Sequence, residues 1–245
     1  MTKAWIEDAK RIVYIAEKDI KIYFFKGPNL IFGLLLPVAL YLAFAIGRTA
    51  EPFPAIPGLV AMASFFGAGA IQAISLPLER RTGTFNMLLA APTSLSTIIL
   101  GKTLAGFFFG TVLSTAYTLI MLPFSPLHNL PLFMLGVLVS SLLFSAFGLF
   151  LSAPFRDIPQ AMPPATVVRI AMVFISGVFI PVEAMPIPIQ TVAYSMPLAY
   201  SVDALRQAMS GSINTQMFLI DLAVQILYSL VFLVAAIQLL KKTIE

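Results

Sequence analysis

The sequence has no cysteine and only one histidine among its 245 residues. The lack of cysteine excludes disulfides, thiolate metal sites and cysteine nucleophiles. A serine–histidine–aspartate arrangement would have to use His128, which stands beside prolines in the segment SPLHNLP, where a histidine is more often an ordinary surface residue. The patterns HExxH, CxxC and GxSxG do not occur. We therefore expect no catalytic residue, no metal site and no cofactor bound by this chain, with an intramembrane enzyme built on His128 as the weakest alternative.

Charged residues are also scarce. They make up 11% of the chain, hydrophobic residues make up 59%, and the mean hydropathy is +0.95. A soluble protein of this size carries about a quarter of its residues as charges, so most of this surface must face something other than water, and lipid is the simplest candidate. The net charge of +4 is not gathered into a basic patch with interleaved aromatics, which argues against a nucleic-acid partner. The phosphate-binding pattern GxxxxGK[ST] is absent as well, so any ATP must be bound by another subunit.

What the chain does have is long apolar runs, which predict an all-α integral membrane protein of one domain, residues 1–245. A helix needs about 20 apolar residues to cross the bilayer core. Six runs qualify, at about 28–47, 56–78, 97–122, 130–153, 160–181 and 215–240.

Three of these runs contain a charged residue. We expect Lys102 to reach the cytoplasmic headgroups and Asp221 to lie near one interface. For Arg169 we favour snorkelling or a polar partner inside the bundle, and a counter-ion for a substrate stays open. Gly106 and Gly110 form a GxxxG pair, which allows close approach of a neighbouring helix and is a weak indication of dimerisation.

The basic residues predict the orientation, because cytoplasmic connections of membrane proteins are enriched in lysine and arginine. With six spans and the N-terminus inside, only Arg48 and Arg206 lie outside. The basic residues then placed inside are Lys3, Lys10, Arg11, Lys18, Lys21, Lys26, Arg80, Arg81, Arg156, Lys241 and Lys242. We therefore expect both termini in the cytoplasm.

The segment before the first span, about 4–25, has apolar residues at helical spacing. The stripe consists of Trp5, Ala9, Ile12, Ala16, Ile20 and Tyr23, with most of the charges away from it. This pattern predicts an amphipathic helix in the cytoplasmic interface of the membrane. A soluble helix packed on a partner protein is the alternative.

Two connections differ from simple loops. Between spans two and three, Gly83 breaks the helix, Thr84 is a plausible N-cap, and Phe85, Leu88 and Leu89 fall on one face of a short helix at about 84–91. A helix this short cannot stand alone in water, so it must pack either on the bundle or on another protein.

Between spans five and six, four prolines interrupt a moderately apolar segment, so it cannot form one span. We expect two short helices at about 183–195 and 198–210, arranged as a re-entrant or interfacial hairpin on the outer side. Tyr194 and Tyr200 suit the headgroup level, and Asp203 and Arg206 can pair on the exposed face. An external loop without a particular role is the alternative.

The stretch LERRTGTFNMLLAAPTSLSTIILGK, residues 78–102, resembles the connection between the second and third spans of the ABC type-2 transporter permeases. The stretch ISGVFIPVEAMPIPIQTVAYSMPLAYSVDALRQAMSG, residues 175–211, is similar to the segment after the fifth span in the same family. The resemblance covers the whole chain in architecture and about a quarter of it in motif.

This resemblance implies the permease subunit of an exporter in the cell membrane. It also implies two copies of a separate ATP-binding subunit, which carry ATP and Mg²⁺, and a second permease, identical or different. The cargo class would be a lipid, a drug-like molecule, a glycolipid or a polysaccharide. A channel or scaffold without ATP coupling is the main alternative.

The same resemblance assigns two sites. A coupling helix would dock on the ATP-binding subunit through Glu79, Arg80, Thr82, Gly83, Thr84, Phe85 and Leu88, with help from the turn at 156–157. An external gate would lie at 181–211, including Pro181, Tyr194, Pro197, Tyr200, Asp203 and Arg206.

Overall fold

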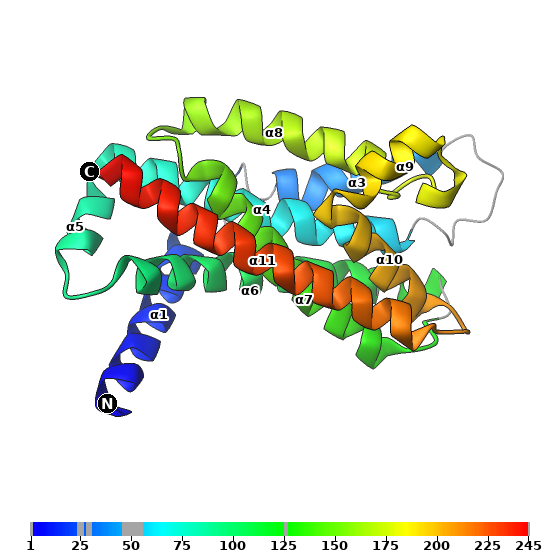
Figure 1. Ribbon diagram of the computed structural model, residues 1–245, viewed down its shortest axis with the longest axis horizontal. Coiled ribbons are helices and arrows are strands. Elements are labelled where there is room, and N and C mark those ends of the chain that lie inside the picture. Colours follow the sequence, from blue (N-terminus) through cyan, green and yellow to red (C-terminus); the bar gives the residue numbers. More distant parts are fainter. Residues whose placement is uncertain (1, 24–26, 28–30, 46–55, 125–126, 245) are drawn as a thin grey trace.

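All regular structure in the described part of this protein is helical. The computed structural model describes residues 2–23, 27, 31–45, 56–124 and 127–244. Five helices in these residues are long and apolar enough to cross a membrane (Figure 1). They are α4 (Ile56–Thr82), α6 (Leu95–Met121), α7 (Leu130–Ser152), α8 (Ile158–Ile175) and α11 (Thr215–Ile244). The prediction of an all-α, multi-pass membrane protein is confirmed.

The first predicted span, about 28–47, lies partly outside the described residues. Within it the chain forms the π-helix η1 (Ile31–Leu35) and the helix α3 (Leu36–Ala45). Since a span needs about 20 residues, this described stretch is too short to count, and six spans stay a prediction.

Four of the other predicted spans match α4, α6, α7 and α11 to within a few residues. The predicted span 160–181 is wrong at its end, because α8 stops at Ile175. Ser176 and Gly177 follow, and Gly177 has φ +81°, a left-handed conformation that a continuing helix does not allow. The chain then forms the 3₁₀ turn η4 (Val182–Ala184), α9 (Ile187–Tyr194) and α10 (Pro197–Met209).

Helix α4 is the centre of the bundle, with every residue of its apolar window buried. Small residues allow its neighbours to approach closely. A Cβ added at Gly110 of α6 would lie 2.7 Å from the Cβ of Ala68, and one added at Gly148 of α7 would lie 2.8 Å from the Cα of Gly69. A Cβ at Gly106 would lie 2.8 Å from the Ala68 carbonyl oxygen. The GxxxG pair of α6 therefore packs against α4 of the same chain, and it gives no support to dimerisation.

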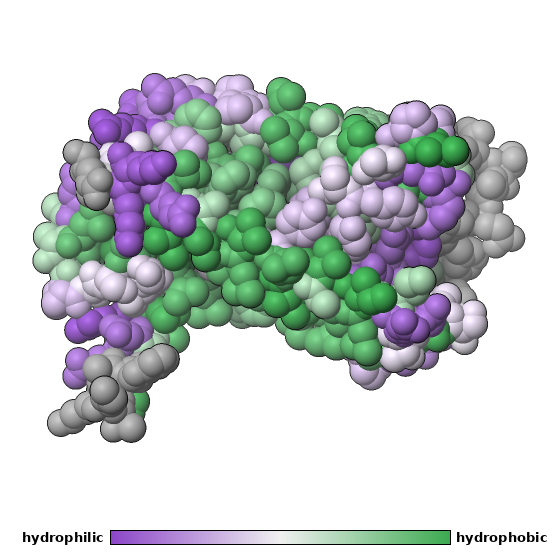
Figure 2. All heavy atoms as spheres, in the orientation of Figure 1, coloured by the Kyte–Doolittle hydropathy of each residue, from purple (hydrophilic) through white to green (hydrophobic). Residues whose placement is uncertain are grey.

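The surface carries a broad apolar band between two polar ends (Figure 2). Helices α8 and α11 contribute to it because only 28% of each apolar window is buried. Val167 of α8 is 68% exposed and Leu227 of α11 is 60% exposed. Side chains of this kind at this exposure fit lipid better than water.

The two polar ends of the bundle differ. The N-terminus, the C-terminus and the helix α5 (Thr84–Ala90) lie at one end, which we call the α5 end, and α9 lies at the other (Figure 1). Helix α1 (Thr2–Tyr23) points away from the bundle at the α5 end, across the direction of the long helices (Figure 1). The predicted helix at 4–25 thus corresponds to α1, although residues 24 and 25 lie outside the described residues.

Candidate functional site

The connection between α4 and α5 is a tight turn at Gly83. Its φ of +77° is left-handed, which disfavours any residue with a Cβ. A seven-residue helix, α5, begins directly after it. Thr84 is not the N-cap that the sequence suggests, because Gly83 holds that position. The Thr84 hydroxyl instead donates to the Glu79 carbonyl oxygen over 3.4 Å and lies 3.0 Å from the Thr82 hydroxyl.

Helix α5 has one buried side chain and an open outer face. Phe85 is 2% exposed and lies in a cluster with residues of α1, α4, α6, α7 and α11, while Leu88 and Leu89 pack partly against it. Met87 points the other way and is 74% exposed. The apolar stripe of α5 therefore packs on the bundle of its own chain, which is one of the two alternatives predicted from the sequence. Met87, which sequence reasoning did not select, is a large apolar side chain on the exposed face of α5.

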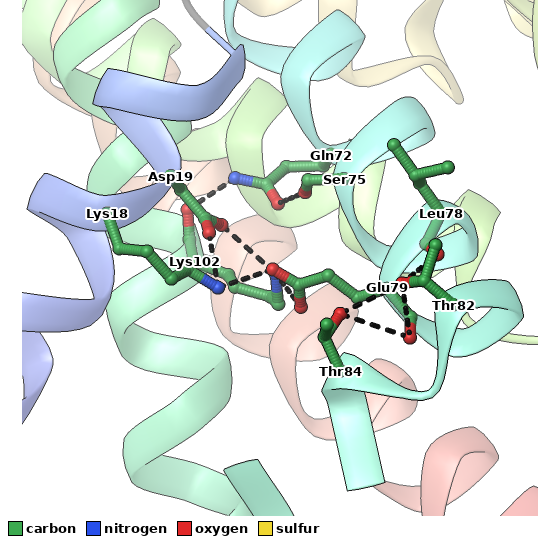
Figure 3. A network of polar contacts seen from close by, with 9 residues as sticks. All are labelled: Lys18, Asp19, Gln72, Ser75, Leu78, Glu79, Thr82, Thr84 and Lys102. Atoms are coloured by element: carbon green, nitrogen blue, oxygen red, sulfur yellow. Dashed lines mark hydrogen bonds and ion pairs between the residues drawn. The ribbon is translucent and has the colours of Figure 1, made fainter. Parts of the chain in front are cut away.

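Four charged side chains meet beneath the α4–α5 turn (Figure 3). The ammonium of Lys102 on α6 lies 3.0 Å from a carboxylate oxygen of Asp19 on α1 and 2.8 Å from one of Glu79 on α4. The ammonium of Lys18 lies 2.9 Å from the other Asp19 oxygen and also pairs with Glu79. Two positive and two negative charges balance, so we call these residues the charge quartet. It fastens α1, α4 and α6 together one short turn away from α5.

The charge quartet is mostly buried, so the loss of one of its charges would leave an opposite charge unpaired inside the protein. The side chains of Lys102 and Asp19 are 0% exposed and that of Glu79 is 2% exposed, whereas Lys18 is 33% exposed. Burial alone would lower the pKa of Lys18, but the carboxylates of Asp19 and Glu79 outweigh it and raise this pKa above its usual value. The prediction that Lys102 reaches the headgroups is wrong, because two buried carboxylates hold its ammonium inside the bundle.

Helix α1 packs on α6 next to the charge quartet. A Cβ at Gly101 of α6 would lie 2.7 Å from the Cβ of Ile15 and 3.0 Å from the Ile12 carbonyl oxygen, so the helices touch. Of the predicted stripe, Ala16 and Tyr23 are buried, both 4% exposed, while the close side-chain contact at Gly101 comes from Ile15, which was not assigned to the stripe. Asp19 lies on this stripe and was missed, although an acid among its apolar residues was the available signal.

Arginines join the other elements of the α5 end. The Arg80 guanidinium donates to the carbonyl oxygens of Ala153 over 2.7 Å and Phe155 over 3.0 Å, in the turn between α7 and α8. Arg156 in that turn donates to the Thr243 carbonyl oxygen of α11 over 3.1 Å. Arg80 and Arg156 line a surface pocket together with Phe85, Asn86 and Thr243. The turn at 156–157 therefore lies beside α5, as its proposed helping role requires.

At the α9 end, the predicted pair of short helices appears as α9 and α10. Arg206 pairs with Asp203 over 3.2 Å, but the two side chains are only 27% and 19% exposed, so the pair does not lie on an exposed face as predicted. Arg206 also donates to the Gly177 carbonyl oxygen over 2.8 Å, which ties α10 to the end of α8. Helix α10 packs into the main core through five apolar residues: Leu198, Val202, Ala204, Leu205 and Ala208.

The remaining predicted residues of the α9 end frame this arrangement. Pro181 precedes η4, and Pro197 is the buried first residue of α10. The Tyr200 hydroxyl donates to the Tyr194 carbonyl oxygen over 2.7 Å. Asp221 is 8% exposed and accepts a 2.8 Å hydrogen bond from Gln207. The structure therefore brings the predicted gate residues together at one end of the bundle, and Asp221 joins them.

Arg169 does not snorkel. It is 5% exposed, and its Nη2 donates to the Gly69 carbonyl oxygen of α4 over 2.8 Å. The prediction of a polar partner inside the bundle is confirmed, and the partner is a backbone group. A substrate counter-ion role is compatible with this geometry.

These features define the class of the protein as a multi-pass helical membrane protein with a short helix at one end, braced by buried charges. The profile of the ABC-2 type transporter family matches residues 15–210. The chain belongs to this family. The match includes the charge quartet, α5, and the segment after α8.

Named relatives agree with this assignment. "Probable multidrug ABC transporter permease YbhR" of Escherichia coli strain K12 is 27% identical over 157 residues, which cover 62% of this chain and 42% of that protein. The protein of the same name from Escherichia coli O157:H7 matches equally. "Nodulation protein J" of Rhizobium leguminosarum bv. viciae is 31% identical over 75 residues, which cover 31% of this chain and 29% of that protein. The matches thus span less than half the length of each relative.

Proposed function

We propose that this chain is the permease subunit of an ATP-driven exporter and that α5 docks on a separate ATP-binding subunit. The observation that carries the proposal is that α5 is short, anchored on the bundle by one face and exposed on the other. It is too short to be stable alone, Phe85 anchors it in the bundle, and Met87 on its outer face is 74% exposed. A braced helix with an exposed apolar side chain suits a contact with a partner protein.

The contacts behind α5 support the transmission of force. The turn at Gly83 is short, and Glu79, four residues earlier, is held by Lys102 and Lys18. Arg80, the next residue, holds the turn between α7 and α8. A displacement of α5 by a partner would therefore act on α1, α6 and α7 together through buried contacts. Closure of two ATP-binding subunits on ATP and Mg²⁺ would supply the energy that shifts the bundle between two states.

The rest of the proposal concerns assembly and location. Two permeases, identical or different, would meet in the cell membrane with both termini in the cytoplasm, which places the basic α5 end inside. Helix α1, lying across the bundle, would rest in the cytoplasmic interface among lipid headgroups, and the α9 end would form the external gate. The cargo would be a lipid, a drug-like molecule, a glycolipid or a polysaccharide, and the name of the YbhR relatives, multidrug transporter permease, favours a drug-like molecule.

Co-purification with a candidate ATP-binding subunit from the same organism tests the docking assignment. Met87→Asp places a charge on the outer face of α5 without disturbing the buried Phe85, and we expect it to abolish the complex. Ile187→Asp is the matched control, because Ile187 is 78% exposed at the α9 end. We expect it to leave the complex intact. A complex that survives Met87→Asp, or the lack of any ATP-binding partner, would favour a channel or scaffold without ATP coupling.

A further inference from the structure

A small pocket lies between α4 and α8, with the charged side chain of Arg169 in its lining. The other lining residues include Ala70 and Ala73 of α4 and Ala165 and Thr166 of α8. The pocket has a volume of about 10 Å³, which is the room of a single water-sized atom. The site is therefore apolar except for one guanidinium and one hydroxyl.

The guanidinium of Arg169 is only partly satisfied. One hydrogen bond goes from Nη2 to the Gly69 carbonyl oxygen, and Nε is buried with no hydrogen-bond partner in the part of the chain that the structure describes. None of the ion pairs among those residues includes Arg169. An arginine has five N–H donors, and a buried charge without a counter-charge is costly. A side chain that is kept at this cost inside a membrane bundle indicates a ligand of opposite charge.

The contact that Arg169 makes on α4 lies far from both ends of that helix. Gly69, which receives its hydrogen bond, is the midpoint of α4, with Ile56 and Thr82 at the two ends. At about 1.5 Å per residue each end is about 20 Å away. An arginine side chain cannot cover that distance to the headgroups by snorkelling.

The backbone of α4 is shaped for this guanidinium. A Cβ at Gly69 would lie 3.0 Å from Nη2 and 3.4 Å from Cζ of Arg169, so only glycine leaves the side chain its full room. On another side, Gly148 of α7 holds the Gly69 backbone in place. The charge therefore has a fixed position in the pocket.

The pocket lies next to exposed apolar residues of α8. Val167, Ile170 and Phe174 are 68%, 40% and 45% exposed on the same helix. Pro163 and Pro164 lie within α8 and remove two backbone donors from its hydrogen-bond ladder, which loosens that part of the helix. A molecule with an apolar chain could lie along α8 with its charged end at Arg169.

We propose that the α4–α8 pocket binds the oxyanion of an amphipathic molecule whose apolar chain lies along α8. The small pocket favours a carboxylate, as in a fatty acid, over a substituted phosphate. The pocket has room for one oxygen atom, so one carboxylate oxygen would enter it and bind the free N–H groups of Arg169, while the other would stay at its mouth near Thr166. This inference rests on the proposed function in so far as the bound molecule is cargo, and it narrows the cargo class to amphipathic anions.

Binding of labelled oleate to the full chain in phosphatidylcholine nanodiscs tests the site. We expect saturable oleate binding to the wild type. We expect the affinity of Arg169→Gln for oleate to be lower by a factor of at least about ten, since a charge-assisted hydrogen bond is lost. Arg169→Lys should recover part of the affinity. Arg11→Gln, on α1, is the matched control because the Arg11 side chain is 34% exposed and away from the pocket lining, and it should bind as the wild type does. Methyl oleate, which has no charge, should bind wild type and Arg169→Gln equally.

A second variant keeps the test valid if Arg169→Gln fails to fold. Thr166→Trp at the half-buried rim covers the mouth of the pocket with the arginine in place, and it should also weaken oleate binding. Equal oleate affinity of wild type and folded Arg169→Gln, or of wild type and folded Thr166→Trp, overturns the proposal. If phosphatidylglycerol displaces oleate from the wild type and not from Arg169→Gln, the site is upheld. Its natural ligand is then an anionic lipid of the bilayer. Docking is tested separately with Met87→Asp, so a chain that binds its ATP-binding subunit but shows no Arg169-dependent oleate binding overturns this inference alone.

Discussion

Replacing Lys102 by methionine removes the fully buried ammonium of the charge quartet and keeps the length of the side chain. Asp19 and Glu79 then share only Lys18, which is 33% exposed, so a net negative charge stays buried. Removal of one partner from a buried ion pair typically costs about 3–5 kcal/mol. We expect about 3 kcal/mol here, because Lys18 and the water near it still screen the carboxylates.

Heat unfolding of the protein purified in dodecyl maltoside measures this loss. For chains of 150–250 residues, about 1 kcal/mol corresponds to about 2–4 °C in Tm, so Lys102→Met should lower Tm by about 6–12 °C. The control is Lys241→Met, which removes an exposed lysine at the end of α11 and should change Tm by less than about 2 °C.

The double variant Lys102→Met with Glu79→Gln tests whether the loss is electrostatic. It leaves only the pair of Lys18 and Asp19, so the net buried charge is again zero. The double variant should therefore lose less Tm than the sum of the two single variants, with a coupling of about 1–3 kcal/mol. Additive losses, or a Lys102→Met protein within about 2 °C of the wild type, would refute the reasoning.

Three further predictions concern other positions. Gly83→Val should lower Tm by several degrees, because a β-branched residue at φ +77° is strained by at least about 1–2 kcal/mol, whereas Gly83→Asn tolerates the left-handed region and should lose less. Gly106→Ala should cost about 1–3 kcal/mol in the same assay, since its Cβ would collide with α4 and α7. Burial raises the pKa of Asp203 to about 6, against the effect of Arg206 and helped by Glu183. The folded state then holds a proton that the unfolded state releases, so this contribution to stability is present below about pH 4 and is lost as the pH rises through about 6. Asp203→Asn should remove that part of the dependence in a pH series of unfolding measurements.

The sequence predicts the long helices well because length and hydropathy are local properties. The runs at 97–122 and 130–153 become α6 and α7 with ends shifted by two residues or fewer. The end of α8 was missed because the residues after Ile175 remain apolar. The stop comes from the backbone of Gly177, and hydropathy does not report backbone conformation.

The candidate site was predicted in its local parts and missed in its long-range parts. The turn at Gly83 and the apolar face of α5 follow from spacing within a few residues. That face has the same pattern whether it packs on its own chain or on a partner, so burial of Phe85 in the bundle could not be deduced. Lys102 pairs with Asp19, 83 residues away. A rule that treats each charge in a span singly directs Lys102 to the headgroups, and only the tertiary fold supplies its partners.

The absence of cysteine makes crosslinking the most direct test of the central claim, because a single introduced thiol has no competitor in this chain. Met87→Cys and Ile187→Cys proteins would each carry a thiol-linked photo-crosslinker in the membrane together with a candidate ATP-binding subunit from the same organism. The account predicts a crosslinked product from position 87 and none from position 187. Crosslinking from position 187 alone, or from neither position while the subunits co-purify, would contradict docking through α5.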